Sequence, residues 1–252
     1  MFDFLKQPVA KFQDFLVLSG RALINVFRAP HYWDDVFLQM NYIGVGGLPI
    51  VMLIGFFSGL VITMQMSRAL SNYGAVGQVG PIVMLTLVRE LGPVLTAVIV
   101  AGRTAAGIAS ELGSMKVSEQ IDAMRALGTD PIQKLVTPRM IATAVMLPLL
   151  TVIADFIGMF GGFLIAYFTL RLTSGQYWTP AYQTLEYNDV VQGLLKPFVF
   201  AFVISLVGCY YGLHTTGGTE GVGRATTQAV VVASVWIFVL TFFIGRIFVH
   251  MG

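Results

Sequence analysis

The sequence predicts an all-α membrane protein with five transmembrane helices, and three observations support this fold class. Hydrophobic residues make up 56% of the 252 residues and charged residues only 11%, whereas an ordinary soluble domain carries about 25% charged residues. The mean hydropathy is +0.78. Five apolar runs, each offering the roughly 20 residues that a spanning helix needs, alternate with polar segments. The net charge of +2 does not indicate a nucleic-acid partner, and the single cysteine, Cys209, excludes an internal disulfide.

Residues 1–29 are predicted to form an amphipathic helix in the membrane interface. Apolar residues recur at alternating three- and four-residue steps, and cations occupy other positions. The apolar set is Phe2, Leu5, Val9, Phe12 and Leu16, and the cations are Lys6, Lys11, Arg21 and Arg28. Such a helix fits the cytoplasmic headgroup layer; the alternative is a helix packed on a soluble partner. Because the first residues lack the pattern of a secretory signal, we expect the N-terminus to be retained.

Residues 30–252 are predicted to form one transmembrane domain. Its spans are expected at about residues 43–66, 81–112, 141–170, 190–213 and 227–249. The second span is interrupted at Gly92-Pro93, and small residues then follow at every fourth position. These are Ala97, Ala101, Ala105, Ala109 and Gly113. In lipid, such a stripe lets two helix backbones approach closely.

The connections and the cations set the predicted orientation. Residues 172–189 are polar and rich in aromatic residues, which indicates an aromatic belt and a small helix outside the membrane. Thr226 or Thr227 could cap the fifth span. Cations precede the first span and flank residues 118–127, so the positive-inside rule places both in the cytoplasm. An odd number of spans then puts the C-terminus in the periplasm.

Residues 118–127 are predicted to form a short polar helix between the second and third spans. Ser118 is the expected N-cap, and Gly128 is the expected stop. Ile121, Met124 and Leu127 fall on one side and are expected to form an exposed apolar stripe that a partner protein could contact. The alternative is a solvated connector.

Charged residues inside the spans are the candidates for function, because a charge at membrane depth costs at least about 2.5 kcal/mol. Arg89 and Glu90 are adjacent, so one helix face cannot pair them. They are expected to face a cavity or a polar ligand; the alternative is a structural contact, such as Glu90 with Lys196. For Asp155, a structural hydrogen bond or protonation is favoured over a substrate role.

A second pair of charges lies two turns apart in the stretch of small residues. Arg103 and Glu111 are expected to neutralise each other's charge near the cytoplasmic interface. The alternative is that they link the cavity near Arg89 and Glu90 to the polar helix of residues 118–127.

Four motifs, in order, resemble the MlaE/YrbE family of ABC transporter permeases. They are RELGP (89–93), AGR (101–103), SELGSMKVSEQIDAMRALGTDP (110–131) and GVGRATT (221–227). The resemblance covers nearly the whole chain and is loosest at the N-terminus and between residues 171 and 189. It implies a homodimeric permease that moves phospholipid or a related lipid between the inner membrane and a periplasmic MCE-domain protein. It also implies two cytoplasmic ABC ATPase subunits and allows a small STAS-domain subunit.

The resemblance also assigns roles to residues of this sequence. The lipid pocket would be formed by Leu70, Tyr73, Arg89, Glu90 and Leu91. The residues of the coupling helix that docks on the ATPase would be Glu119, Ile121, Asp122, Met124, Arg125 and Gly128. No cofactor is expected on this chain, since ATP and Mg would be used by the partner ATPase.

Motifs for catalysis are not found in the sequence. There is no GxxxxGK[ST], HExxH or GxSxG, so we expect no enzymatic activity and no metal site, and energy must come from another subunit. Two rival functions remain open: a stand-alone, proton-linked lipid transporter or scramblase using Arg89, Glu90 and Asp155, and an assembly anchor without a transport pathway.

Overall fold

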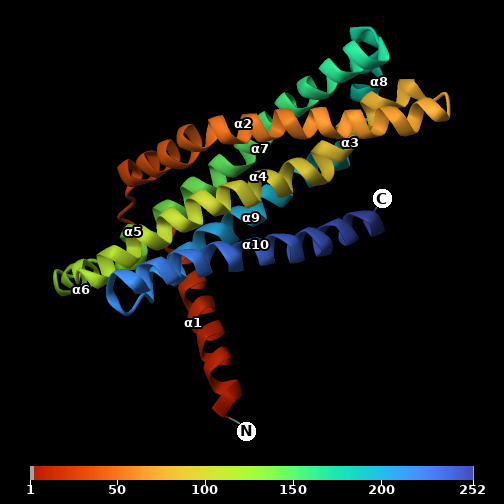
Figure 1. Ribbon diagram of the computed structural model, residues 1–252. Coiled ribbons are helices and arrows are strands. Elements are labelled where there is room, and N and C mark those ends of the chain that lie inside the picture. The colour runs from red at the N-terminus through yellow and green to blue at the C-terminus, as the bar shows by residue number, and fades with distance from the viewer. Residues whose placement is uncertain (1–2, 252) are drawn as a thin grey trace. The chain divides into compact units, whose positions relative to one another are not determined.

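The computed structural model describes residues 3–251 and is built from helices, with no strand in that range (Figure 1). The α-helices are α1 (Asp3–Asn25), α2 (Trp33–Asn72), α3 (Val79–Thr86), α4 (Gly92–Val100), α5 (Ala106–Val117), α6 (Gln120–Ala126), α7 (Thr137–Leu170), α8 (Ser174–Thr184), α9 (Tyr187–Leu213) and α10 (Gly218–Met251). A 3-10 turn, η1 (Val76–Gln78), precedes α3. Three π-helical segments interrupt or precede the long helices: η2 (Leu87–Leu91), η3 (Ala101–Ala105) and η4 (Ile132–Val136). The predicted all-α class is confirmed.

Five helices in the described range are long and apolar enough to cross a membrane. They are Trp33–Asn72, Val76–Val117, Ile132–Leu170, Tyr187–Leu213 and Gly218–Phe248. Each contains one of the five spans that the sequence predicts. The break expected at Gly92-Pro93 does not end the second helix, because η2 passes the chain from α3 into α4 through one turn of wider winding.

All five spanning helices begin before the residue that the sequence predicts, and α2 and α10 are two of those with the larger differences. Helix α2 starts at Trp33, where Asp34 and Asp35 occupy the first turn and interact favourably with the helix dipole. Helix α10 starts at Gly218, nine residues before the predicted span. The prediction that Thr226 or Thr227 caps this helix is therefore wrong. Both hydroxyls instead donate to carbonyls four residues earlier within the helix.

The chain divides into two compact units, each made of three separate segments. Unit 1 contains the described residues up to Ile43 together with Val100–Val145 and Ala201–Trp236. Its core includes Leu18 and Ala22 of α1, both buried. The predicted apolar set of α1 behaves differently, since Val9, Phe12 and Leu16 are more than half exposed. Helix α1 therefore packs on unit 1 through the face that carries Leu18 and Ala22 and leaves the predicted apolar face exposed. The structure does not describe the side chains of Phe2 and Leu5, the two other members of the predicted set.

Unit 2 contains Gly44–Ile99, Met146–Phe200 and the described residues from Ile237 onward. Its core joins α3, η2, α7 and α8. Helix α8 begins with a capping box between Thr173 and Gln176. Tyr177 of α8 is fully buried, and its hydroxyl donates to the carbonyl oxygen of Met159 at 3.3 Å. Burial raises the pKa of Tyr177 above its ordinary value. The expected short helix is present as α8, but Tyr177 belongs to the core and not to an exposed aromatic belt.

The stripe of small residues packs as predicted. Ala97, Ala101, Ala105 and Ala109 are all fully buried. In unit 1, a Cβ built on Gly208 of α9 would lie 3.1 Å from the carbonyl oxygen of Ala105, and one on Gly212 would lie 3.2 Å from that of Ala109. A side chain at either position would push the two backbones apart by a few tenths of an ångström, so glycine favours this close approach.

Candidate functional site

Pro93 leaves the second span with a backbone carbonyl that an ordinary helix would satisfy. In an α-helix the carbonyl of Arg89 accepts from the N–H of residue 93, but proline has no N–H. The π-helical turn η2 also connects Gly92 N–H to the carbonyl of Leu87, five residues earlier. A side-chain donor replaces the missing N–H: Nζ of Lys196 donates to the Arg89 carbonyl at 2.7 Å. Such a freed group is tolerated at membrane depth only where protein or a wet cavity satisfies it.

Helix α9 presents a row of polar side chains to η2 in unit 2. Asp189, Gln192 and Lys196 recur at three- and four-residue steps, which places them on one helix face. Each contacts Arg89 or Glu90. We refer to these five residues as the η2–α9 cluster.

The cluster contains two ion pairs that reach across about a hundred residues of sequence. Nε of Arg89 donates to Oδ1 of Asp189 at 2.5 Å, and Nζ of Lys196 lies 2.6 Å from Oε1 of Glu90. Gln192 donates its amide to the same Glu90 oxygen at 3.2 Å. Two cations and two anions balance each other, so the cluster is formally neutral.

The two helices contribute very different surfaces to this cluster. The side chains from α9 are buried, at 0% exposure for Lys196 and 3% for Asp189. The side chains from η2 are partly open, at 42% for Arg89 and 47% for Glu90. Each buried charge therefore holds an outward-facing partner of opposite sign. One guanidinium and one carboxylate from neighbouring residues are thus partly exposed, and each is held by a buried residue of α9.

The sequence analysis named three of the five residues of this cluster. Arg89 and Glu90 were expected to be functional, and the Glu90–Lys196 contact offered as the structural alternative is present. Asp189 and Gln192 were missed. Their spacing with Lys196 along one face of an apolar helix was the available signal.

The other predicted pocket residues are not all gathered at this cluster. Leu70 and Leu91 pack together against the apolar core of unit 2. Tyr73, in the turn between α2 and η1, is 85% exposed. The role of these residues in lipid binding stays a prediction.

The short polar helix is present as α6, but its first turn differs from the prediction. The expected N-cap, Ser118, instead ends α5 and donates its hydroxyl to the carbonyl of Ser114 at 2.9 Å. Glu119 precedes α6 with a left-handed φ of 61°. The predicted cap is therefore wrong, because the hydroxyl back-bonds to α5 instead of accepting from the N–H groups of α6.

The end of α6 forms as predicted. Gly128 has a φ of +79°, a conformation that glycine adopts without steric cost. Its N–H bonds to the carbonyl of Arg125, and the N–H of Thr129 bonds to that of Met124. These two bonds form a Schellman motif.

The apolar stripe predicted on α6 is not uniformly exposed. Ile121 is fully buried in the core of unit 1, and Met124 packs against that core. Leu127 alone of the three is exposed, at 83%. The prediction of an exposed stripe is thus wrong for Ile121, because the helix uses that face to attach to its own unit.

The polar side of α6 carries a small charge network. Asp122 accepts from Nζ of Lys116 at 2.8 Å and from Arg125 at 3.3 Å. The hydrogen bond from Lys116 is the main reason that the pKa of Asp122 lies below its ordinary value. This network and Leu127 are accessible, so a partner could contact them.

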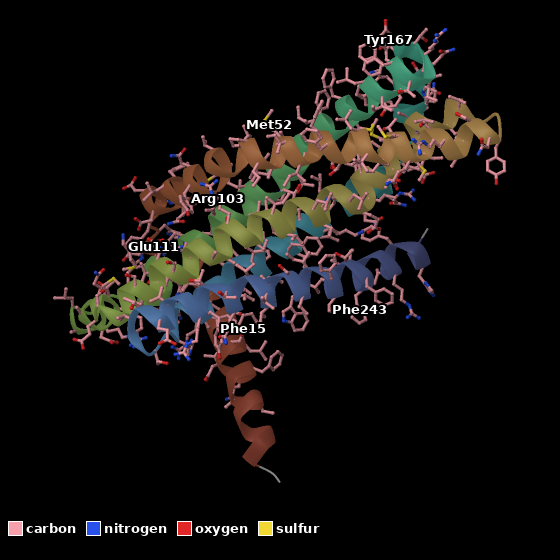
Figure 2. All side chains as sticks on the ribbon, in the orientation of Figure 1. Phe15, Met52, Arg103, Glu111, Tyr167 and Phe243 are labelled. Atoms are coloured by element: carbon pink, nitrogen blue, oxygen red, sulfur yellow. The ribbon has the colours of Figure 1, made fainter. Side chains whose placement is uncertain are left out.

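Arg103 and Glu111, labelled in Figure 2, do not satisfy each other as the sequence suggests. Glu111 pairs with Arg139 at 2.8 Å, and Arg103 lies over the ring of Tyr42, 5.1 Å from its centre. One guanidinium nitrogen of Arg103 is buried without a hydrogen-bond partner in the described chain. The prediction fails because a tertiary partner on α7 competes for Glu111.

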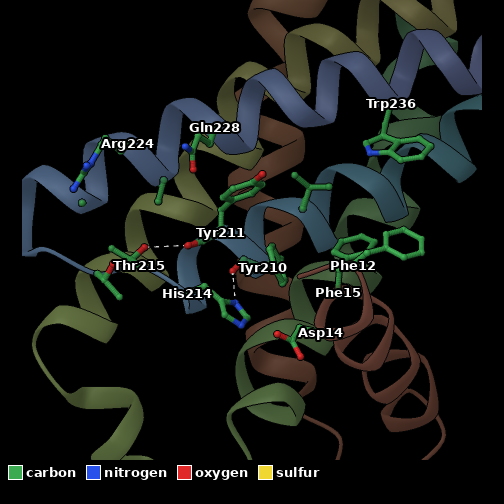
Figure 3. A pocket seen from close by; sticks show the side chains of 14 residues that line it. Phe12, Asp14, Phe15, Tyr210, Tyr211, His214, Thr215, Arg224, Gln228 and Trp236 are labelled. Atoms are coloured by element: carbon green, nitrogen blue, oxygen red, sulfur yellow. Dashed lines mark hydrogen bonds between the residues drawn. The ribbon is translucent and has the colours of Figure 1, made fainter. Parts of the chain in front are cut away.

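Unit 1 also contains a cavity of about 730 Å³, with a mixed polar and apolar lining, that the sequence did not predict (Figure 3). It is lined by α1, the end of α9 and the beginning of α10. His214 donates through Nδ1 to the carbonyl of Tyr210 at 2.8 Å, and Thr215 donates to that of Tyr211 at 3.0 Å. Arg224 contributes a cation from α10.

Five spanning helices and a charged cluster at a π-helical break define a multi-pass α-helical membrane protein with a polar site inside its apolar segments. The sequence profile of the family described as permease MlaE matches residues 36–247. The chain therefore belongs to the MlaE permease family.

Individual relatives agree with this assignment. The chain is 42% identical to a probable ABC transporter permease protein of Rickettsia bellii, over 97% of this chain and 93% of the relative. It is 35% identical to the chloroplastic protein TRIGALACTOSYLDIACYLGLYCEROL 1 of Arabidopsis thaliana, over 92% and 66%. It is 32% identical to the intermembrane phospholipid transport system permease protein MlaE of Haemophilus influenzae, over 95% of each.

Proposed function

We propose that this chain is the permease subunit of an ABC transporter that moves phospholipid between the inner membrane and a periplasmic MCE-domain partner. A separate cytoplasmic ATPase supplies the energy. The observation that carries the proposal is the η2–α9 cluster, in which Arg89 and Glu90 are partly open and each is held by a buried residue of opposite charge.

The chemistry of the cluster suits a phospholipid headgroup. A guanidinium binds phosphate oxygens with directional hydrogen bonds, so Arg89 is the group for the lipid phosphate. Glu90 is the group for a headgroup ammonium. Because the cluster is neutral, a zwitterionic headgroup adds no net charge to it. The neighbouring Leu91 and Leu70 belong to an apolar cluster and would contact acyl chains.

The proposed coupling runs along the second spanning helix, which is helical from η2 to Val117 and is joined to α6 by a turn at Ser118 and Glu119. ATP binding would close a pair of ATPase subunits against α6 of a homodimer. The polar network around Asp122 and the exposed Leu127 offer contacts to that partner. Ile121 is buried in the core of unit 1, so α6 is packed firmly on that unit. A force applied to α6 by the ATPase would therefore displace the spanning segments of unit 1 together with it.

The orientation belongs to the same proposal. Cations near α6, including Lys116, Arg125 and Lys134, support a cytoplasmic position for this end and for the N-terminus. The C-terminus of α10 would then lie in the periplasm, and α1 would lie in the cytoplasmic headgroup layer with Phe12 and Leu16 toward the acyl chains.

The test is to purify the chain with its ATPase and MCE-domain partners and to measure bound phospholipid by mass spectrometry. We expect Glu90→Gln to reduce bound phospholipid severalfold while the complex still assembles. The matched control is Glu220→Gln, which changes an exposed carboxylate of α10. Equal phospholipid in both variants would contradict the assigned site, and transport driven by a pH gradient without an ATPase would contradict the assigned energy source.

A further inference from the structure

Asp155 of α7 carries a carboxylate oxygen that no donor of the described chain reaches. Its Oδ1 atom is buried and has no hydrogen-bond partner among residues 3–251. A Cβ built on Gly92 would overlap this atom, so Oδ1 faces the first turn of α4. The structural hydrogen bond that the sequence favours for Asp155 is therefore not made by Oδ1. An enclosed acceptor of this kind normally has a donor, which can be a bound water molecule.

A small cavity borders both Asp155 and Gly92. Its volume is about 10 Å³, which is about the smallest space that can hold one water molecule. Its walls come from α2, η2, α4 and α7, all within unit 2. Among the described residues that line it, only Ser58, Thr96 and Asp155 are polar. A larger cavity of about 210 Å³ also borders Asp155, but Gly92 and the two hydroxyl residues do not line it, so the buried Oδ1 belongs to the small cavity.

The positions of the two hydroxyl residues point them toward the same space. Thr96 follows Gly92 by four residues, so both lie on the face of α4 that meets Asp155. Ser58 follows Gly55 of α2 by three residues, and both line the cavity. A Cβ at Gly55 would contact the backbone of the residue before Asp155, which places this face of α2 against the same part of α7.

Neither hydroxyl group has a hydrogen-bond partner within the described chain. In apolar helices such groups commonly donate to a carbonyl three or four residues earlier, as those of Ser67, Thr86 and Thr143 do. Ser58 and Thr96 make no such bond, although Thr96 is only 1% exposed. Burying a hydroxyl without a partner costs free energy. Two donors and one acceptor thus border one small space, and each lacks a protein partner.

The size and the number of polar groups favour water over the other possible occupants. A buried water molecule makes about three hydrogen bonds, and it can accept from two hydroxyls while it donates to a carboxylate oxygen. A hard cation such as Ca²⁺ takes six to eight oxygen ligands, and the remaining lining side chains carry no oxygen. A lipid headgroup exceeds the volume.

We infer that this cavity is a binding site for one water molecule, which donates to Oδ1 of Asp155 and accepts from the hydroxyls of Ser58 and Thr96. The water joins α2, α4 and α7 beside the π-helical turn and satisfies a carboxylate at membrane depth without a cation. None of the five residues of the η2–α9 cluster lines the cavity, so the two sites are separate. The inference does not depend on the proposed transport of phospholipid.

The direct test is a crystal structure of the full chain, grown in a lipid mesophase, at a resolution that shows ordered water. We expect a density peak about 2.5–3.0 Å from Oδ1 and from both hydroxyl oxygens. Asp155→Asn should keep the peak, because the amide oxygen accepts in place of the carboxylate, and Asp155→Leu should lose it. Crystals grown without sodium, calcium or magnesium should show the same peak.

Thermal unfolding of the same variants gives a second measurement. Thr96→Val removes one hydroxyl with little change of shape and should lower the melting temperature by about 2–4 °C. In the Asp155→Leu background, where the water is gone, the same change should have an effect of less than about 1 °C. The matched control is Thr143→Val. Thr143 is also buried, but it donates within α7 and lies about 18 Å along the helix from Asp155, so its effect should be equal in both backgrounds.

Three results would overturn the inference. A map that shows other buried waters but no peak here would reject the site. A peak that disappears in Asp155→Asn, or in crystals grown without those cations, would identify an ion and reject water. Equal shifts of melting temperature for Thr96→Val in the original chain and in the Asp155→Leu background would show that the two side chains share no ligand.

Discussion

Replacing Lys196 with methionine tests the central contact of the η2–α9 cluster. The change keeps a long apolar side chain but removes the donor that reaches the Arg89 carbonyl at 2.7 Å and the Glu90 carboxylate at 2.6 Å. An unsatisfied buried carbonyl costs about 1–3 kcal/mol. Loss of the hydrogen bond to Glu90 adds about 1.5 kcal/mol. We take this low end of the range for hydrogen bonds to charged groups because Glu90 is about half exposed to solvent. We therefore expect Lys196→Met to destabilise the chain by about 3 kcal/mol.

The assay is thermal unfolding of the purified chain, followed by tryptophan fluorescence. For a chain of 150–250 residues, 1 kcal/mol corresponds to about 2–4 °C, so the melting temperature should fall by about 6–12 °C. Lys134→Met is the matched control. Lys134 also pairs with a carboxylate, Asp35, but is 34% exposed, so its loss should cost only about 0–1 kcal/mol. Equal shifts for the two variants would refute the argument that Lys196 satisfies the carbonyl that Pro93 leaves free.

Three further predictions concern packing, the end of α6 and pH. Gly59→Leu should destabilise unit 2 by about 1–3 kcal/mol or more in thermal unfolding, since a Cβ there would overlap the carbonyl of Gly158 on α7. Gly128→Leu should cost about 1–2 kcal/mol in its left-handed conformation and lower the ATPase rate of the assembled complex. In a carbon-13 NMR titration, the carboxyl group of Asp122 should titrate with a pKa below the ordinary value of 3.8. Lys116→Gln should raise the pKa of Asp122 toward that ordinary value. Because the pKa of Asp122 is lower in the folded chain than in the unfolded chain, its contact with Lys116 stabilises the fold at pH values above the unfolded pKa. This stabilisation is lost as the pH falls through the folded pKa.

Each of these predictions has a control. Gly223→Leu introduces the same side chain into open space and should leave the melting temperature within about 1 °C. Gly128→Asn should retain most of the ATPase rate, because asparagine tolerates the left-handed conformation; equal loss in both Gly128 variants would contradict the conformational argument. If Lys116→Gln leaves the pKa of Asp122 unchanged, the hydrogen bond between them does not cause the shift.

Local features were predictable from the sequence wherever one stretch of chain decides them. Hydropathy summed over about 20 residues located the five spans, and a glycine after a helix marked the Schellman motif at Gly128. The small residues from Ala97 to Gly113 indicated close helix packing without identifying the partner. Helix boundaries were less well predicted: α10 begins well before Thr227, because a helix can extend beyond the membrane wherever its polar residues remain hydrated.

Partner identity was not predictable, because it depends on residues far apart in the sequence. Ser118 fits the pattern of an N-cap but bonds back to Ser114, and Glu111 pairs with Arg139 instead of Arg103. Ile121 has the spacing of an exposed stripe but is buried by the core of its own unit.

The sequence by itself determined the all-α class, the number of spans and the membership in the permease family, because apolar runs, helix stops and linear motifs are properties of neighbouring residues. The tertiary structure decided which charges meet. Arg89 and Glu90 become a pair of oriented, partly open groups only because α9 brings Asp189 and Lys196 against the turn that Pro93 distorts. Burying a charge is tolerable only opposite a partner of the other sign, and packing across a hundred residues selects that partner.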